Sequence, residues 1–91
     1  MQKQNMINCY AMYDRKGERY DTPFYCRDDL SAKRHFIMVQ RNPETLPYQF
    51  PDDFDLYRIG GFDYVSGISI EGLTLIMEGK QVAKEERIDE K

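Results

Sequence analysis

The sequence predicts an α+β domain: a small antiparallel β-sheet made of two hairpins, about four strands, with one helix packed on one face. Two strand-like segments come first, a segment with helical periodicity follows them, and two further strand-like segments come last. The chain has 91 residues, which is enough for one domain with one thin core. The expected order is therefore β-β-α-β-β.

The first hairpin is predicted from alternation in residues 7–14. One set of side chains points to one side of this strand and a second set to the other: Ile7, Cys9, Ala11 and Tyr13 against Asn8, Tyr10, Met12 and Asp14. Residues 14–18 are polar and contain a glycine, which is typical of a hairpin turn. The second strand is expected over residues 20–26. Because Pro23 has no backbone N–H, we expect this strand at an edge of the sheet or bulged at Pro23.

The helix is expected to begin after Asp28, a good N-cap residue, and to continue to Arg41. Pro43 ends it, because the residue before a proline avoids the helical conformation. The predicted apolar face consists of Ala32, Phe36 and Val39, flanked by Leu30 and Ile37.

Residues 43–53 contain three prolines and are expected to form a connecting loop, pinned by Leu46, Tyr48 and Phe50. The second hairpin follows, with strands over residues 54–62 and 68–77 and a turn between them. The glycines Gly60 and Gly61 lie inside the third strand, where glycine usually marks a bulge. We therefore expect a single α+β domain over residues 1–77 and a charged, flexible C-terminal tail over residues 78–91.

Composition excludes several classes of function. The formal net charge is −3, so the chain does not resemble a histone-like protein that binds duplex DNA through bulk charge. No apolar run is long enough to cross a membrane, and residues 1–12 lack the apolar centre of a signal peptide. We expect a cytoplasmic protein with no membrane association. In that reducing compartment its two cysteines, Cys9 and Cys26, are expected to be free structural thiols.

No catalytic residue, metal site or cofactor site is predicted. The chain has one histidine, His35, so one chain cannot form a histidine cluster. The acids at Asp52, Asp53, Asp55 and Asp63 lack the ligand order of a calcium loop and fit turns better. No serine or cysteine stands in the sequence context of a nucleophile, and nothing selects a pair of acids for general acid–base chemistry. We therefore expect that the protein is not an enzyme.

The basic residues are unevenly distributed. Residues 14–41 carry seven basic against five acidic side chains, whereas residues 42–77 carry one basic against six acidic. Cations interleaved with aromatic rings can follow phosphates and stack bases of single-stranded nucleic acid. The candidate binding residues, expected to form one continuous patch, are Arg15, Lys16, Arg19, Arg34, Arg41, Tyr10 and Tyr20. On residue chemistry alone, a solvated helix face and tyrosines that pack across strands are the favoured explanation.

A resemblance to a known family covers residues 6 to about 70. It rests on Y-x-x-Y-D in the first strand, a T-P-F step, a helix rich in Arg and Phe, F-P-x-D-F-x-L-Y-R-I-G, and F-D-x-x-S-G. In these features the chain resembles the small nonstructural protein of gokushoviruses, which are single-stranded DNA phages of the Microviridae. Where that family tends to have an acid before F-D, this chain has Gly61. Any role of that acid is therefore not carried over.

The resemblance implies a DNA-binding protein that acts in viral DNA replication and turns it toward single-strand synthesis and packaging. Its ligand would be single-stranded or replicating phage DNA, and its partners phage or host replication and packaging proteins. It would act in the cytoplasm of the bacterial host and not in the virion. The alternative is a non-enzymatic protein-interaction module, a homodimer that docks a host or phage replication or assembly protein. The acidic residues 42–77 and the exposed sheet edges suggest this alternative, and a homodimer would cover such edges.

Overall fold

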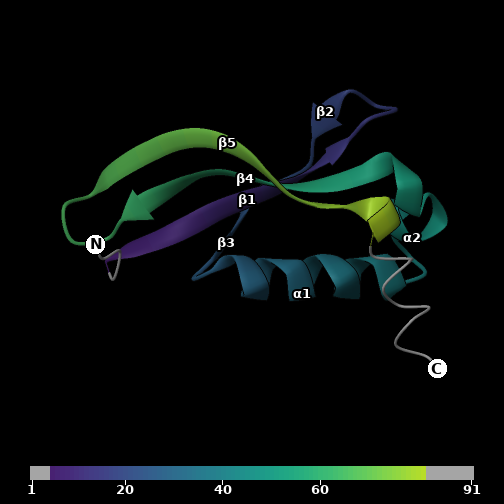
Figure 1. The fold of residues 1–91 in the computed structure, drawn as a ribbon, viewed down its shortest axis with the longest axis horizontal. Helices are drawn as coiled ribbons and strands as arrows, with labels where there is room; N and C mark the ends of the chain where they lie inside the picture. Colours follow the sequence, from purple (N-terminus) through teal and green to yellow (C-terminus); the bar gives the residue numbers. More distant parts are fainter. Residues whose placement is uncertain (1–4, 82–91) are drawn as a thin grey trace.

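The computed structural model describes residues 5–81 and contains one antiparallel sheet with a helix along it (Figure 1). The strands are β1 (Met6–Asp14), β2 (Arg19–Tyr20), β3 (Phe24–Cys26), β4 (Phe54–Asp63) and β5 (Ile68–Glu78). The order across the sheet is β2-β1-β4-β5, and β3 also pairs with β1. The predicted α+β class and the placement of the helix between two strand pairs are confirmed.

The predicted second strand is divided into two short strands. β2 pairs with the end of β1 at Tyr13 and Asp14, and β3 pairs with residues 8–10 of the same strand. Pro23 lies in the interruption, where its missing N–H would leave a gap in the ladder. The predicted irregularity at Pro23 is therefore confirmed.

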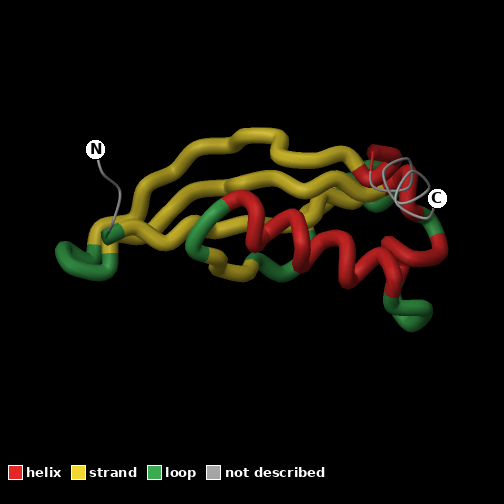
Figure 2. The backbone as a smooth tube through the Cα atoms, turned by 60° about the horizontal axis from the view of Figure 1, so that its bottom comes forward, coloured by secondary structure: helices red, strands yellow, loops and turns green. Residues whose placement is uncertain are grey.

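The helix α1 (Asp29–Arg41) has the predicted bounds. The Asp28 carboxylate accepts a hydrogen bond from the backbone N–H of Ser31 at 2.8 Å, which caps the first turn and lowers the pKa of Asp28. Figure 2 shows α1 lying lengthwise against the strands. Ala32 and Phe36 are buried as predicted, but Leu30 is exposed. The apolar face is therefore narrower at the start of the helix than the periodicity indicated.

The connection between α1 and β4 contains two short helical segments where the sequence predicted only a loop. They are α2 (Leu46–Gln49) and the 3-10 helix η1 (Pro51–Asp53). Thr45 Oγ1 accepts a hydrogen bond from the N–H of Tyr48 at 3.2 Å and so caps α2. The prediction that Leu46, Tyr48 and Phe50 pin this segment is wrong, because all three are exposed, whereas Pro47 is buried.

The core lies between α1 and one face of the sheet. Its members are Tyr10, Met12, Ala32, Phe36, Phe54, Leu56 and Met77. Because side chains of a strand alternate between faces, burial of Tyr10 and Met12 under α1 turns Cys9, Ala11 and Tyr13 to the opposite face. We call this opposite side the open face.

The second hairpin contains the predicted bulge and turn. The register between β4 and β5 shifts between Arg58 and Gly60. A Cβ atom on Gly60 would collide with the carbonyl oxygen of Ile70, so the close approach of β5 requires glycine there. The Asp63 carboxylate accepts hydrogen bonds from the N–H groups of Val65 and Ser66, which close the turn and lower the pKa of Asp63.

The end of β5 is tied back to the sheet. Gly79 is buried, and its N–H donates a hydrogen bond to Asp55 Oδ1 at 3.2 Å. Residues 82–91 of the predicted tail lie outside the described residues. Within residues 5–81, no helix is long and apolar enough to cross a membrane.

Candidate nucleic-acid interface

Three tyrosines from three different strands meet on the open face. Tyr13 of β1 lies opposite Tyr20 of β2, with ring centroids 4.7 Å apart. The Tyr57 ring of β4 lies edge-on to both, with centroids 6.2 Å from Tyr13 and 5.9 Å from Tyr20. Tyr20 is exposed and the other two rings are half-buried. This tyrosine cluster is held by ring contacts but retains surface on which a flat ligand could stack.

A cation lies beside the tyrosine cluster. Arg15 Nη1 donates a hydrogen bond to Asp55 Oδ2 at 2.5 Å; the Asp55 side chain is 6 % exposed and the Arg15 side chain 41 %. Burial, and then the negative charge of Asp55, raise the pKa of the Tyr57 phenol. The guanidinium thus neutralises the nearest carboxylate while part of it still faces solvent.

A fourth tyrosine extends this aromatic surface along the sheet. Tyr25 of β3 is exposed and lies opposite Cys9 in the ladder, so both side chains are on the open face. Cys9 precedes Tyr13 by four residues on β1, a distance of about 13 Å along a strand. The open face therefore presents aromatic rings at two points along β1.

Tyr10 has a different environment from the one predicted. It has no exposed surface, its hydroxyl donates a hydrogen bond to Asp29 Oδ1 at 2.5 Å, and it accepts one from Asn8 Nδ2 at 3.0 Å. Burial, reinforced by the hydrogen bond to Asp29, raises the pKa of Tyr10 to about 12. The proposed stacking role of Tyr10 is wrong for this structure, because its ring belongs to the core.

The Asp29 carboxylate, which accepts the hydrogen bond from Tyr10, also anchors the start of α1 to the sheet. Arg58 Nη1 lies 2.9 Å from both carboxylate oxygens of Asp29. Burial acts to raise the pKa of Asp29, but the hydrogen bonds from Tyr10 and Arg58 outweigh it and hold the pKa below its ordinary value. The carboxylate of Asp29 therefore connects α1, β1 and β4 and is fully engaged in structure.

The candidate cations do not form one patch. Figure 1 shows the hairpin that carries β2 on one side of the sheet and α1 on the other. Arg15, Lys16 and Arg19 belong to this hairpin, whereas Arg34 and Arg41 belong to α1. The predicted continuous basic surface is therefore divided between two sides of the molecule.

The hairpin cations themselves point in different directions. Arg15 lies with the tyrosine cluster, as its contact with Asp55 shows. Arg19 lines a hollow with Tyr20, Thr45 and Leu46, and Lys16 lines another with Leu46 and Phe50. These two side chains thus lie at the border between the hairpin and α2.

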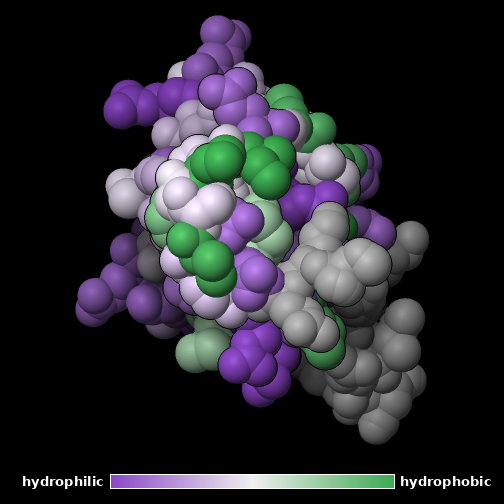
Figure 3. Space-filling model, turned by 90° about the vertical axis from the view of Figure 1, so that its left-hand side faces the viewer, coloured by the Kyte–Doolittle hydropathy of each residue, from purple (hydrophilic) through white to green (hydrophobic). Residues whose placement is uncertain are grey.

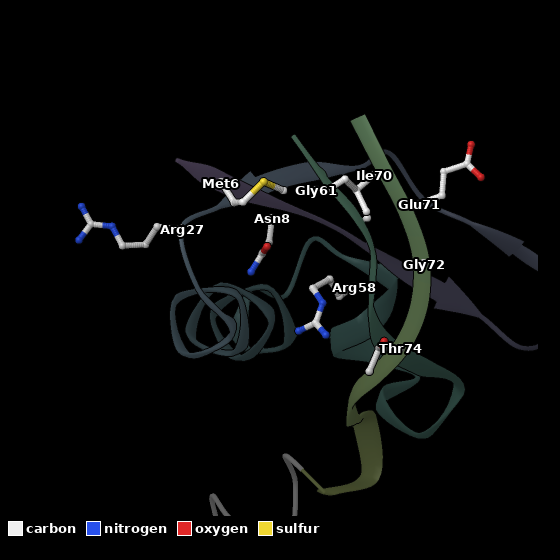
Figure 4. Close-up of a pocket in the computed structure, with 10 residues that line it drawn as sticks. Met6, Asn8, Arg27, Arg58, Gly61, Ile70, Glu71, Gly72 and Thr74 are labelled. Atoms are coloured by element: carbon white, nitrogen blue, oxygen red, sulfur yellow. The ribbon is translucent and has the colours of Figure 1, made fainter. Parts of the chain in front are cut away.

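Another hollow, of about 380 Å³, lies on the helix side of the sheet, between the start of α1 and β5 (Figure 4). Arg58 and Asn8 point into it, and Arg27 and Glu71 extend outward at its rims. Gly60 and Gly61 form part of its floor. Since Arg58 is already paired with Asp29, this hollow offers few free polar groups and does not define a site by itself.

The geometry fits a binding surface. Within residues 5–81, no three His, Cys, Asp or Glu side chains are placed to hold a metal ion. Fold and site together define a small α+β domain whose sheet is covered by a helix on one face and displays aromatic side chains and a cation on the other.

The chain belongs to the phage ORF5 protein family, whose model matches residues 7–82. This match is longer at its C-terminal end than the resemblance noted from the sequence. No curated protein gives a significant match to the chain, and no solved structure gives one.

Sequence reasoning did not select Tyr13 and Tyr57 as site residues. The alternation in residues 7–14 separates Tyr13 from Tyr10 and could have indicated that the two rings have different surroundings. Tyr57 lies opposite Ala11 in the ladder, and Ala11 is two positions from Tyr13 on β1. The sequence does not indicate this pairing, because the register between β1 and β4 joins residues that are 40 or more positions apart.

Proposed function

We propose that this phage protein binds single-stranded DNA on the open face of its sheet. The observation that carries the proposal is the tyrosine cluster of Tyr13, Tyr20 and Tyr57 next to Arg15. Aromatic rings on a sheet stack on unpaired bases of any sequence, and neighbouring cations attract the phosphates between them. Duplex DNA hides its bases from such a surface, so the single-stranded form is the expected ligand.

The role we propose is in viral DNA replication, where the protein favours single-strand synthesis and packaging. The resemblance to the small nonstructural protein of gokushoviruses supports this role, as does membership of a phage protein family. In this role the protein acts without catalysis in the cytoplasm of the bacterial host, outside the virion, with replicating phage DNA as its ligand. Phage or host replication and packaging proteins are its expected further partners.

The residue assignment differs from the one that the sequence suggested. Tyr20 and Arg15 stay, and Tyr13 and Tyr57 replace Tyr10 as stacking residues. Lys16 and Arg19 drop out, because they line hollows at the border with α2 and do not belong to the open face. Arg34 and Arg41 drop out, because α1 lies on the other side of the sheet.

The test is a titration of a labelled oligothymidylate of about 12 nucleotides, a length within the range of known single-strand sites. A single phosphate contact, from Arg15, predicts that log K falls with log salt at a slope of about −0.7, or roughly 2.6-fold between 50 and 200 mM salt. Tyr20→Ala should weaken binding by about 5- to 150-fold, the equivalent of one lost stacked base. Tyr20→Phe keeps the ring and should change affinity little.

Arg34→Gln is the matched control, because this exposed cation belongs to the helix side. It should leave affinity within about two-fold, since only its long-range charge is lost. Absence of binding at 50 mM salt ends the proposal. A large loss in Arg34→Gln with none in Tyr20→Ala moves the site to α1 and also contradicts the proposal.

A further inference from the structure

The outer edge of β5 is a long row of unpaired backbone groups. β5 pairs with β4 along one edge, and the described part of the chain supplies no strand for the other edge. The strand has 11 residues, a length of about 36 Å. Its residues from Ile68 to Leu75 are all exposed. Such an edge is a template for another strand unless the sequence protects it.

β5 has apolar side chains on both of its faces. Thr74 lies opposite Arg58 on the helix side, and Leu75 lies opposite Tyr57 on the open face. By alternation, Ile68 and Ile70 share the side of Thr74, and Leu73 shares the side of Leu75. The four apolar side chains Ile68, Ile70, Leu73 and Leu75 are each at least 45 % exposed. Apolar groups are also visible at the surface of the end of the molecule where β4 turns into β5 (Figure 3).

The charged and proline residues that usually protect an edge strand are nearly lacking from β5, although its ladder with β4 contains two register shifts. Soluble proteins guard such edges with lysine, proline or inward-pointing charges. Between Ile68 and Met77 the strand contains no lysine, arginine or proline, and Glu71 is its one charged residue. An exposed, long and nearly uncharged edge of this kind is expected to be covered in the functional protein.

We propose that β5 pairs with β5 of a second copy of this chain, antiparallel, about a two-fold axis. An antiparallel edge is complementary to itself, so one strand supplies both partners, and two-fold dimers are the commonest oligomers. An axis near Gly72 places Glu71 opposite Leu73 and Ile70 opposite Thr74 of the other copy, so that no acid faces an acid. A basic peptide would find only one carboxylate along this stretch, which makes it a poorer occupant.

This dimer does not depend on DNA binding. The two sheets would join into one sheet, and the apolar side chains of the two copies would cover each other on both faces. The two open faces would lie on the same side of the joined sheet, because a two-fold axis perpendicular to a sheet preserves its sides.

The experiment is a measurement of molar mass by light scattering, without DNA, over a range of micromolar concentrations. The wild-type chain should have twice the 10.8 kDa mass of one copy. Leu73→Glu places an acid opposite Glu71 of the other copy, and Ile70→Lys places a charge at the edge opposite Thr74; these side chains are 62 % and 52 % exposed, and each change should return the mass of one copy. Met38→Lys is the control: Met38 is 68 % exposed on α1, and this change should leave the dimer intact.

Hydrogen exchange gives a second measure in the same samples. The amides of residues 68–77 that point to the outer edge should be protected in the wild-type protein and lose protection in Leu73→Glu, while the amides of β1 remain protected. A circular-dichroism spectrum equal to that of the wild type excludes unfolding of a variant. A wild-type mass of one copy throughout, or a dimer that persists in both edge variants, overturns the proposal.

Discussion

The face of the sheet that α1 covers and the open face both carry tyrosines, in different surroundings. On the covered face, Tyr10 has no exposed surface and its hydroxyl donates a hydrogen bond to Asp29. On the open face, Tyr13, Tyr20 and Tyr57 contact one another, and Tyr20 is exposed. A tyrosine whose ring and hydroxyl are both engaged by the core serves the fold, whereas one held only by other rings remains available to a ligand.

The covered face and the open face should differ most in how much their side chains contribute to the free energy of unfolding. Phe36→Ala, under the sheet, removes a fully buried ring from between α1 and the strands and should cost about 3–5 kcal/mol of unfolding free energy. That is a large part of the roughly 5–15 kcal/mol available to a domain. Tyr20→Ala on the open face should cost less than about 1.5 kcal/mol, the value of ring contacts alone.

Urea denaturation followed by circular dichroism measures both changes. Equal losses for Phe36→Ala and Tyr20→Ala would show that the open face is as much a part of the core as the covered face. The comparison between the two faces would then fail.

An effect of intermediate size is expected at high pH for Tyr10, on the covered face. The pKa of Tyr10 is raised to about 12, so the neutral phenol stabilises the fold fully below pH 10 and this contribution is lost as pH rises through about 12. Two pKa units correspond to roughly 3 kcal/mol. In an ultraviolet absorbance titration, Tyr10→Phe should remove a late-ionising tyrosine. A late transition that is unchanged in Tyr10→Phe would contradict the assignment.

The smallest expected effect concerns the ion pair between Arg58 and Asp29. Their side chains are 33 % and 41 % exposed, so solvent screens the attraction. A double-mutant cycle with Asp29→Asn and Arg58→Gln should give a coupling of about 1 kcal/mol or less in urea denaturation. A coupling of several kcal/mol would instead indicate that this pair dominates the attachment of α1.

Local features of the fold could be predicted from the sequence because their causes are local. Asp28 caps α1 and Asp63 closes the second hairpin turn, each through atoms a few residues away, and Gly60 marks a bulge against Ile70 of the same hairpin. The helical segment α2 was missed although its signal is also local: Thr45 stands as a cap before Pro47. A segment with three prolines in eleven residues reads as loop unless the cap is given weight.

The candidate site depends on relations that the sequence does not state. Alternation sorts the side chains of β1 into two sets, but it does not indicate which set α1 covers. Tyr10 was therefore chosen although it is buried, and Tyr13 was passed over. In the same way, sequence proximity grouped the cations of the hairpin with those of α1, although the sheet separates them.

The central position of β1 has a consequence for how the chain reaches its native state. β1 is made first, but its inner edge pairs with β4, and Asp55 is joined by Arg15 and by Gly79. Contacts between such distant segments slow folding. During synthesis, one edge of β1 therefore stays unpaired until β4, which lies 40 or more residues later, has left the ribosome. We expect the nascent protein to depend on this delay being short, because a bare strand is prone to join a neighbouring chain.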